Sequence, residues 1–157
     1  MQKISTLIVA LMLVLAGHAQ ENKEEVQIKN TIERFFEGLH KGDSSIVAKT
    51  LHKEIKIQTT FTDKSGVKQL KTQSRTSLLR AIASKKPKDV YFEKLLRYDI
   101  KIDGNLAAVW TPYEFYFNGK FSHCGANSFQ LFNNNGRWEI IYLVDMRKRQ
   151  GCQSNDN

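Results

Sequence analysis

The sequence predicts an α+β domain in which helices lie on one face of a curved antiparallel or mixed sheet. Apolar residues recur at helical spacing in three stretches before residue 87, whereas strand-type runs fill most of the chain after it. Asn118-Gly119 separates the aromatic run from Val109 to Phe117 from the run that starts at Lys120, which is the strongest short hairpin signal. Helices that precede a meander of antiparallel strands are typical of this fold class.

The first predicted helix runs from Glu24 to Leu39 and ends where Gly42 can adopt the left-handed conformation. Asp43 or Ser44 caps a short second helix. A third helix ends before Pro87, because proline cannot continue a helix, and its apolar face carries Leu78, Leu79 and Ile82. We therefore expect three helices on the N-terminal side of the sheet, packed on its concave face.

The predicted strands cover residues 53–61, 67–72 and 88–102 and lead into a three-strand meander from residue 105 to residue 147. Alternation of apolar and polar residues marks the first of them, and turn residues bound the others. The second joint of the meander is Asn133-Asn134-Asn135-Gly136. The order of elements is thus helix, helix, strand, strand, helix and then four long antiparallel strands, and such a sheet closes like a cone around a cavity.

The tight turn at Asn118-Gly119 also predicts which side chains face each other. A two-residue type I′ loop fixes the register of the two strands that it joins. Counting back from this loop predicts the pairs Phe117–Lys120, Tyr116–Phe121, Glu114–His123 and Trp110–Asn127. A carboxylate would then face an imidazole across the sheet.

The same register gathers polar side chains on one otherwise apolar face, which predicts a pocket for a small, partly apolar molecule. Buried polar groups need partners or a ligand. The predicted ligand-binding residues are Trp110, Glu114, His123, Asn127 and Tyr142. His123 and Glu114 are the candidates for catalytic proton transfer, and Tyr142 is a candidate donor to a developing oxyanion. Three roles stay open for the Glu114–His123 pair: a purely structural cross-strand contact, orientation of a ligand, or catalysis.

Asp145 and Arg147 fall on the opposite face in strict alternation, although a single bulge would reverse their direction. Three roles stay open for them: pocket residues, a paired surface charge, or partners of the tail. We favour a structural ion pair. That opposite face is too apolar for water, which predicts a homodimer packed sheet to sheet. Its apolar residues are Val109, Tyr113, Phe115, Phe117, Phe132, Ile141 and Leu143.

The order of elements, together with the run from Phe35 to Asp43 and the run from Gly136 to Ile140, resembles the nuclear transport factor 2-like superfamily. The runs 109–116, 121–125 and 145–147 are similar to exported bacterial members labelled SnoaL-like or putative lumazine-binding. The resemblance covers nearly the whole mature chain and implies a cone-shaped sheet. This architecture hosts isomerases, dehydratases, cyclases and noncatalytic modules, so the resemblance leaves the function open.

The N-terminal residues predict export. Residues 1–19 read as a signal peptide, with Lys3, a short apolar run and a small-residue cleavage site before Gln20. The apolar run is short for a membrane span. Residues 20–150 form the predicted domain and residues 151–157 a tail. Because export places them in an oxidising compartment, Cys124 and Cys152 are expected to form a disulfide, with two unpaired cysteines as the alternative.

Charge and histidine spacing disfavour several other functions. The net charge of +8 is spread along the chain rather than concentrated, and an exported protein rarely meets nucleic acid, so we expect no nucleic-acid partner. His40, His52 and His123 lack the spacing of metal ligands. The sequence contains no phosphate-binding glycine loop, and we expect neither a metal nor a cofactor.

Overall fold

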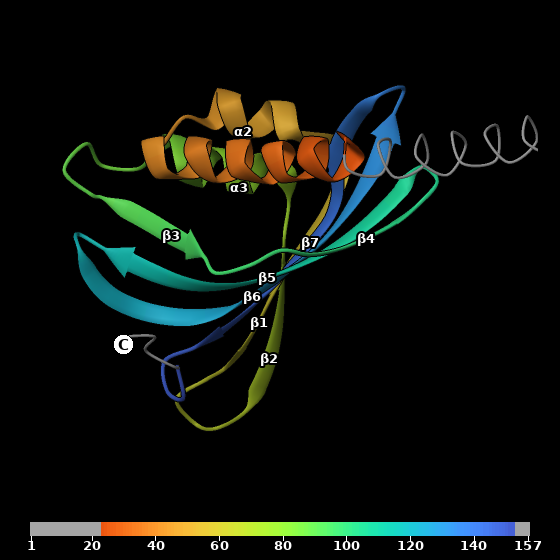
Figure 1. Ribbon diagram of the computed structural model, residues 1–157. Helices are drawn as coiled ribbons and strands as arrows, with labels where there is room; N and C mark the ends of the chain where they lie inside the picture. The colour runs from red at the N-terminus through yellow and green to blue at the C-terminus, as the bar shows by residue number, and fades with distance from the viewer. Residues whose placement is uncertain (1–22, 153–157) are drawn as a thin grey trace, which may run out of the picture.

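Three helices and a curved, unclosed mixed sheet of seven strands build the protein, as a computed structural model of residues 23–152 describes it (Figure 1). The predicted fold class is therefore confirmed. The expected signal peptide and residues 153–157 of the expected tail lie outside the described residues. No helix within residues 23–152 is long and apolar enough to cross a membrane.

The helices cover residues 23–41, Ser44–Thr50 (α2) and Arg75–Ala83 (α3). Their starts follow the capping chemistry of the sequence, since a side-chain oxygen at the N-cap satisfies backbone N–H groups. The Asp43 carboxylate accepts from the backbone nitrogens of Ser45 and Ile46, at 2.8 and 3.2 Å. All three helices lie against the same face of the sheet, which is its concave face (Figure 1).

The strands pair in the order β2-β1-β7-β6-β5-β3, and β4 pairs with β5 beside β3. Only the β1–β7 pair is parallel among the described strands. The strands are β1 (Leu51–Thr62), β2 (Lys68–Gln73), β3 (Tyr91–Leu95), β4 (Asp99–Asp103), β5 (Leu106–Phe117), β6 (Lys120–Asn134) and β7 (Arg137–Lys148).

The prediction of a single strand over residues 88–102 is wrong, because the chain forms two strands, β3 and β4, with a break between them. The break lies opposite Pro112 in β5. The backbone N–H of Leu96 donates to the Pro112 carbonyl at 2.9 Å, but Pro112 has no N–H to donate in return. The edge of the sheet therefore passes from one short strand to another at this point.

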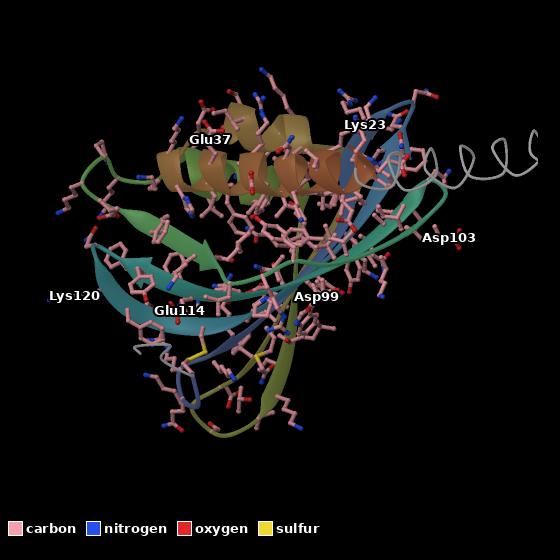
Figure 2. The ribbon with its side chains drawn as sticks, viewed as in Figure 1. Lys23, Glu37, Asp99, Asp103, Glu114 and Lys120 are labelled. Atoms are coloured by element: carbon pink, nitrogen blue, oxygen red, sulfur yellow. A yellow bond between two sulfur atoms is a disulfide. The ribbon has the colours of Figure 1, made fainter. Side chains whose placement is uncertain are left out.

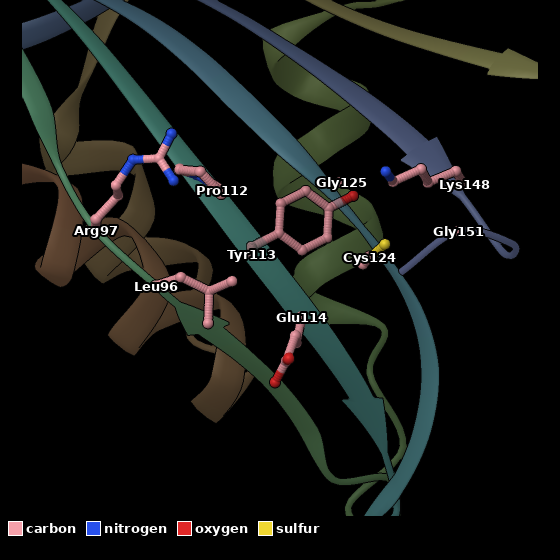
Figure 3. Close-up of a pocket in the computed structure, with 9 residues that line it drawn as sticks. All are labelled: Leu96, Arg97, Pro112, Tyr113, Glu114, Cys124, Gly125, Lys148 and Gly151. Carbon is pink, nitrogen blue, oxygen red and sulfur yellow. The ribbon is translucent and has the colours of Figure 1, made fainter. Parts of the chain in front are cut away.

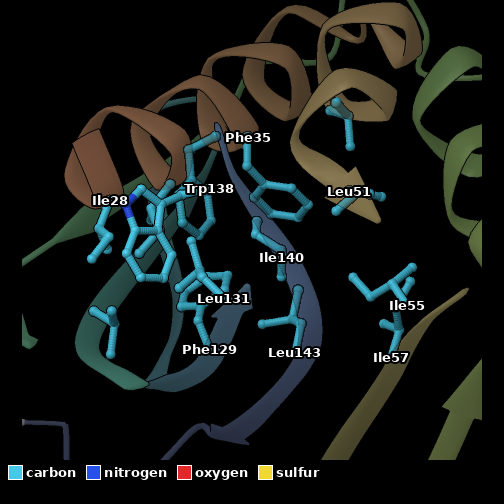
Figure 4. Packing of buried hydrophobic residues seen from close by; sticks show 14 of the residues in the cluster. Ile28, Phe35, Leu51, Ile55, Ile57, Phe129, Leu131, Trp138, Ile140 and Leu143 are labelled. Carbon is cyan, nitrogen blue, oxygen red and sulfur yellow. The ribbon is translucent and has the colours of Figure 1, made fainter. Parts of the chain in front are cut away.

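The hydrophobic core fills the space between the helices and the concave face. Figure 4 shows Phe35 of the first helix above Leu131 and Ile140 of the sheet, and Ile28 of the same helix at the level of Trp138. All five are at most 2% exposed. Burying a side chain of this size stabilises a fold by about 1.5–3 kcal/mol, so these contacts fix the helices on the concave face.

The hairpin turn forms as predicted, but its register holds for only two residue pairs. Asn118 and Gly119 both have positive φ, 51° and 75°, as a type I′ turn requires. The pairs Phe117–Lys120 and Tyr116–Phe121 are confirmed. Beyond them Ser122 is an extra residue in β6, so that Phe115 pairs with His123.

This bulge overturns the pairing on which the predicted pocket rests. Glu114 pairs with Cys124 rather than with His123, and Asn127 pairs with Thr111 rather than with Trp110. A shift by one residue exchanges the two faces of a strand. Glu114 and His123 therefore point to opposite sides of the sheet, and both predicted pairings are wrong.

A second bulge lies in β7 at Ile141. Gln130 pairs with Tyr142 and Leu131 with Ile140, so that Ile141 is the extra residue. Strict alternation from Trp138 placed Asp145 on the outer face. The bulge instead turns Asp145, and with it Arg147, onto the concave face.

The two bulges also remove the apolar patch from which a homodimer was predicted. Val109, Tyr113 and Leu143 are at most 8% exposed and lie on the concave face. The convex face instead exposes Trp110 and Phe121, at 46% and 48%. The homodimer stays a prediction, without the patch that suggested it.

Candidate functional site

Along five neighbouring strands the concave face changes from apolar to polar at the same level. In β6, for example, the core residues Phe129 and Leu131 are followed toward the hairpin by Asn127 and then His123. We call the polar side chains at this level the concave polar cluster. It comprises Thr59 of β1, Glu93 of β3, Tyr113 of β5, Asn127 of β6, and Asp145 and Arg147 of β7.

Glu93 is held by a neutral partner. Its Oε1 atom accepts from the Asn127 amide nitrogen at 2.8 Å, and the described residues offer it no salt bridge. Burial and the charge of Asp145 raise the pKa of Glu93 to about 7, against the opposing effects of the Asn127 hydrogen bond and the charge of Arg147. Glu93 can therefore gain or lose a proton near neutral pH.

Asp145 organises the other half of the cluster. Its carboxylate accepts from the Thr59 hydroxyl at 2.6 Å, from Arg147 Nε at 2.5 Å and from the Tyr113 hydroxyl at 3.5 Å. Burial and the neighbouring Asp145 raise the pKa of Tyr113, so that its hydroxyl stays protonated. The interaction between Arg147 and Asp145 is an ion pair, and it lies inside the concavity rather than on the outer face.

Gly125 and Thr111 are the cross-strand neighbours of the cluster residues Tyr113 and Asn127. Gly125 of β6 sits where a Cβ atom would come within 1.8 Å of the Met146 carbonyl oxygen and 2.9 Å of the Tyr113 hydroxyl. Only glycine fits this close approach of two strands. The fully buried Thr111 hydroxyl, beside Asn127 on the next strand, has no hydrogen-bond partner within residues 23–152.

His123 borders the cluster as a neutral aromatic ring. It stacks on Phe115 with ring centres 4.8 Å apart and planes inclined by 26°, and it meets the Tyr113 ring edge-on. Burial, together with the positive charges of Arg147 and Arg149, lowers the pKa of His123 to about 4. The imidazole is therefore uncharged at neutral pH.

The remaining predicted ligand-binding residues lie on the convex face. Glu114 is 6% exposed and is held there by Lys94 Nζ at 3.4 Å and by the Tyr116 hydroxyl at 2.9 Å. The Tyr142 hydroxyl donates to Gln58 at 2.5 Å, and Trp110 is 46% exposed. Of the five predicted residues, the structure brings together only His123 and Asn127.

The expected disulfide between Cys124 and Cys152 is present, which fixes the chain beyond β7 to β6. Beside it lies a surface hollow of about 510 Å³ (Figure 3). Figure 2 shows that Glu114, one of its lining residues, lies toward the hairpin tip at Lys120 and away from Asp103. The lining residues are Leu96, Arg97, Pro112, Tyr113, Glu114, Cys124, Gly125, Lys148 and Gly151. Tyr113 alone belongs to both this hollow and the concave polar cluster.

Sequence reasoning missed Glu93, Tyr113 and Thr59. A signal for Glu93 existed, because it alternates with Tyr91 and Leu95 and so occupies an inward position of its strand. Tyr113 was assigned to the wrong face by the undetected bulge. Within residues 23–152 no group of three His, Cys, Asp or Glu side chains could hold a metal ion.

Residues 23–144 match the model of the family described as "Putative lumazine-binding". The chain belongs to this family. The match to the putative lumazine-binding family spans most of the chain and includes every residue of the concave polar cluster except Asp145 and Arg147. No curated protein sequence matches the chain.

Solved structures confirm the nuclear transport factor 2-like fold of this family member. A nuclear transport factor 2-like protein with a cystatin-like fold from Novosphingobium aromaticivorans is 14% identical, with a TM-score of 0.67 over 88% of this chain and 90% of that chain. A nuclear transport factor 2-like protein of unknown function from Shewanella baltica is 18% identical, with a TM-score of 0.59 over 81% and 95%. A putative dehydratase of the nuclear transport factor 2-like family from Streptomyces avermitilis is 11% identical, with a TM-score of 0.61 over 82% and 99%. At these identities the likeness establishes the fold alone.

Proposed function

We propose that the protein binds a small molecule at the concave polar cluster. Glu93 carries this proposal, because it is a largely buried carboxyl group held only by a neutral amide and its pKa is raised to about 7. Purely structural carboxylates are usually closed off by cations or several donors. A carboxyl group that retains bonding capacity on a concave face is typical of a ligand site.

The family description supports a small-molecule ligand and makes lumazine the first compound to test. Lumazine is a planar heterobicycle with hydrogen-bonding groups along its edges. Glu93, Asn127 and Tyr113 present both donors and acceptors on the concave face, which suits such an edge. The convex hollow beside the disulfide is the alternative place for a ligand.

The experiment is calorimetric titration of the protein with lumazine, comparing a concave variant with a convex one. We expect Asn127→Leu to weaken binding at least about tenfold, which corresponds to about 1.4 kcal/mol. Glu114→Gln, which changes a buried carboxylate on the convex face, serves as the matched control and should leave affinity unchanged. Equal losses in both variants would contradict the concave site. No binding by the wild type would favour a structural or interaction subunit whose concavity serves no ligand.

A second candidate function is proton transfer on the bound molecule, as in an isomerase, dehydratase or cyclase. The geometry disfavours His123 with Glu114 in this role, because the two side chains lie on opposite faces. Glu93 replaces Glu114 as the candidate, since its pKa lies near neutral pH. Incubation of the complex in D₂O tests this role: deuterium entering the ligand with the wild type but not with Glu93→Gln supports catalysis, and no exchange supports binding alone.

We also propose that the protein is exported, with its signal peptide cleaved after Ala19. The disulfide between Cys124 and Cys152 supports this, because such bonds persist in oxidising compartments. The mass of the protein recovered from the periplasm or medium tests the cleavage site. Retention of the full-length chain in the cytosol with both thiols reduced would contradict export.

A further inference from the structure

We infer that the molecule bound at the concave face is a planar aromatic or heteroaromatic anion, whose charged group binds the terminal nitrogens of Arg147 and whose ring packs against Phe115 and His123. This inference rests on the proposed function and names the chemical class of its ligand. Two independent features carry it: an oriented guanidinium group with open donors, and a row of aromatic rings that leads to it.

The guanidinium group of Arg147 is held in one orientation, but within the described residues only one of its three nitrogens has a hydrogen-bond partner. Its Nε donates to Asp145 at 2.5 Å, and Asp145 is itself held by Thr59 at 2.6 Å. Within residues 23–152 no hydrogen-bond partner contacts the two Nη atoms. The Arg147 side chain is 55% exposed, whereas that of Asp145 is 13% exposed. Two Nη groups on a fixed plane match the two oxygens of a carboxylate.

The charges around Arg147 favour an anion. Asp145 balances Arg147, and Glu93 is only partly ionised near neutral pH. Arg149 adds a second positive charge near His123, since both arginines lower the pKa of His123. Lys71 lies over the ring of Phe61, the residue that pairs with Arg147 across β1 and β7. A cationic ligand would meet this excess positive charge, whereas an anionic ligand would relieve it.

Aromatic rings continue from this charge toward the hairpin tip. His123 stacks on Phe115 at 4.8 Å, and Tyr91 lies 6.0 Å from Phe115 and 5.7 Å from Phe117. All four rings are at least partly exposed. Stacked and edge-on aromatic contacts contribute about 0.5–1.5 kcal/mol beyond the area that they bury, so this row favours a flat ring over a saturated one.

Three probes with the same carbon skeleton separate charge from planarity. Naphthoate is planar and anionic, naphthamide is planar and neutral, and decahydronaphthoate is anionic and saturated. Titration calorimetry of each probe with the wild-type protein should show naphthoate binding at least about tenfold more tightly than either of the other two. Equal affinity for naphthoate and naphthamide, or no binding of naphthoate up to the millimolar range, would overturn the inference.

Two neighbouring basic residues supply a matched pair of variants. Arg147→Gln removes the proposed anchor on the concave face, and Lys148→Gln makes the same charge change one residue later, where the side chain lines the convex hollow. We expect Arg147→Gln to reduce naphthoate affinity to that of naphthamide and Lys148→Gln to leave it unchanged. Phe115→Leu should reduce the preference for naphthoate over decahydronaphthoate. Circular dichroism and thermal melting establish that each variant is folded.

The outcomes also distinguish this inference from the function on which it rests. If all three probes bind equally and Asn127→Leu abolishes the binding of each, the concave site stands and the ligand class is wrong. If Lys148→Gln weakens naphthoate as much as Arg147→Gln does, charge acts from a distance and the Arg147 anchor is wrong. If no concave variant changes any titration, both proposals fail.

Discussion

Two carboxylates on adjacent strands, Glu93 and Glu114, differ in the partners that hold them. Glu114, on the convex face, receives an ammonium group and a phenol hydroxyl, and its cross-strand neighbour Cys124 is covalently bonded to the chain beyond β7. Glu93, on the concave face, receives one neutral amide from Asn127. The convex groups satisfy one another and stabilise the fold, whereas the concave groups keep bonding capacity that a ligand can use.

The largest expected effect comes from the convex face. Cys152→Ser opens the disulfide, which links residues 28 positions apart, and should lower the free energy of unfolding by about 2–4 kcal/mol. Urea denaturation of the variant and the wild type measures this loss. Titration with lumazine should be unchanged, since the bond braces the side of the sheet that carries no ligand. A stability loss below about 1 kcal/mol would show that the convex face is not the braced one.

Glu93→Gln should change the pH dependence of stability. The unfolded chain ionises Glu93 near its ordinary pKa of 4.5, whereas the folded chain holds the proton until a pKa of about 7. The stabilisation is therefore complete below pH 4.5 and is lost as pH rises through 7. The loss is on the order of 2–3 kcal/mol for a shift of this size.

Urea denaturation of Glu93→Gln and the wild type between pH 4 and pH 8 measures this effect. The variant should gain stability relative to the wild type across that interval, because glutamine does not ionise. A constant difference between the two proteins at every pH would mean that Glu93 titrates normally and resembles its convex counterpart.

Glu114→Gln should have a smaller effect, about 1 kcal/mol, because it weakens one hydrogen bond and one partly exposed ion pair. Lys94 is 51% exposed, which limits what its charge contributes. A double-mutant cycle with Lys94→Met isolates the pair. A coupling energy well above about 1 kcal/mol would assign more of the fold's stability to this contact than its geometry supports.

The last effect concerns His123, which should make the protein more sensitive to acid. Its folded pKa of about 4 lies below the ordinary value of 6.5, so the unfolded chain takes up a proton first as pH falls. The stability that the neutral ring provides is present above pH 6.5 and is lost as pH falls toward 4. Because Glu93 acts in the opposite direction between pH 4.5 and 6.5, Glu93→Gln is the background for the measurement. In the Glu93→Gln background, adding His123→Gln should flatten the remaining dependence of the unfolding free energy on pH. An unchanged pH dependence would contradict the lowered pKa of His123.

The sequence was sufficient for the fold class, the helix starts, the hairpin turn and the disulfide. Each depends on local chemistry: Asp43 caps a helix, and Asn118-Gly119 supplies the two positive φ angles of the turn. The position of the break at Pro112 could also have been inferred, since proline cannot donate to a neighbouring strand.

The site could not be predicted because two bulges decide which face each residue occupies. Aromatic residues occur at both parities of β5 from Trp110 to Phe117, and apolar residues do so in β7 from Ile140 to Val144. Neither strand shows an alternation that would reveal a shift of one residue. Ser122 and Ile141, the extra residues, carry no local signature of a bulge. Tertiary packing, rather than local sequence, sets these positions.

The central claim is that a ligand binds on the concave face, and a crystal structure of the protein grown with naphthoate tests it most directly. The account predicts electron density for the ring against Phe115 and His123, with the carboxylate at the Nη atoms of Arg147. Density confined to the convex hollow beside Pro112 and Lys148 would contradict it.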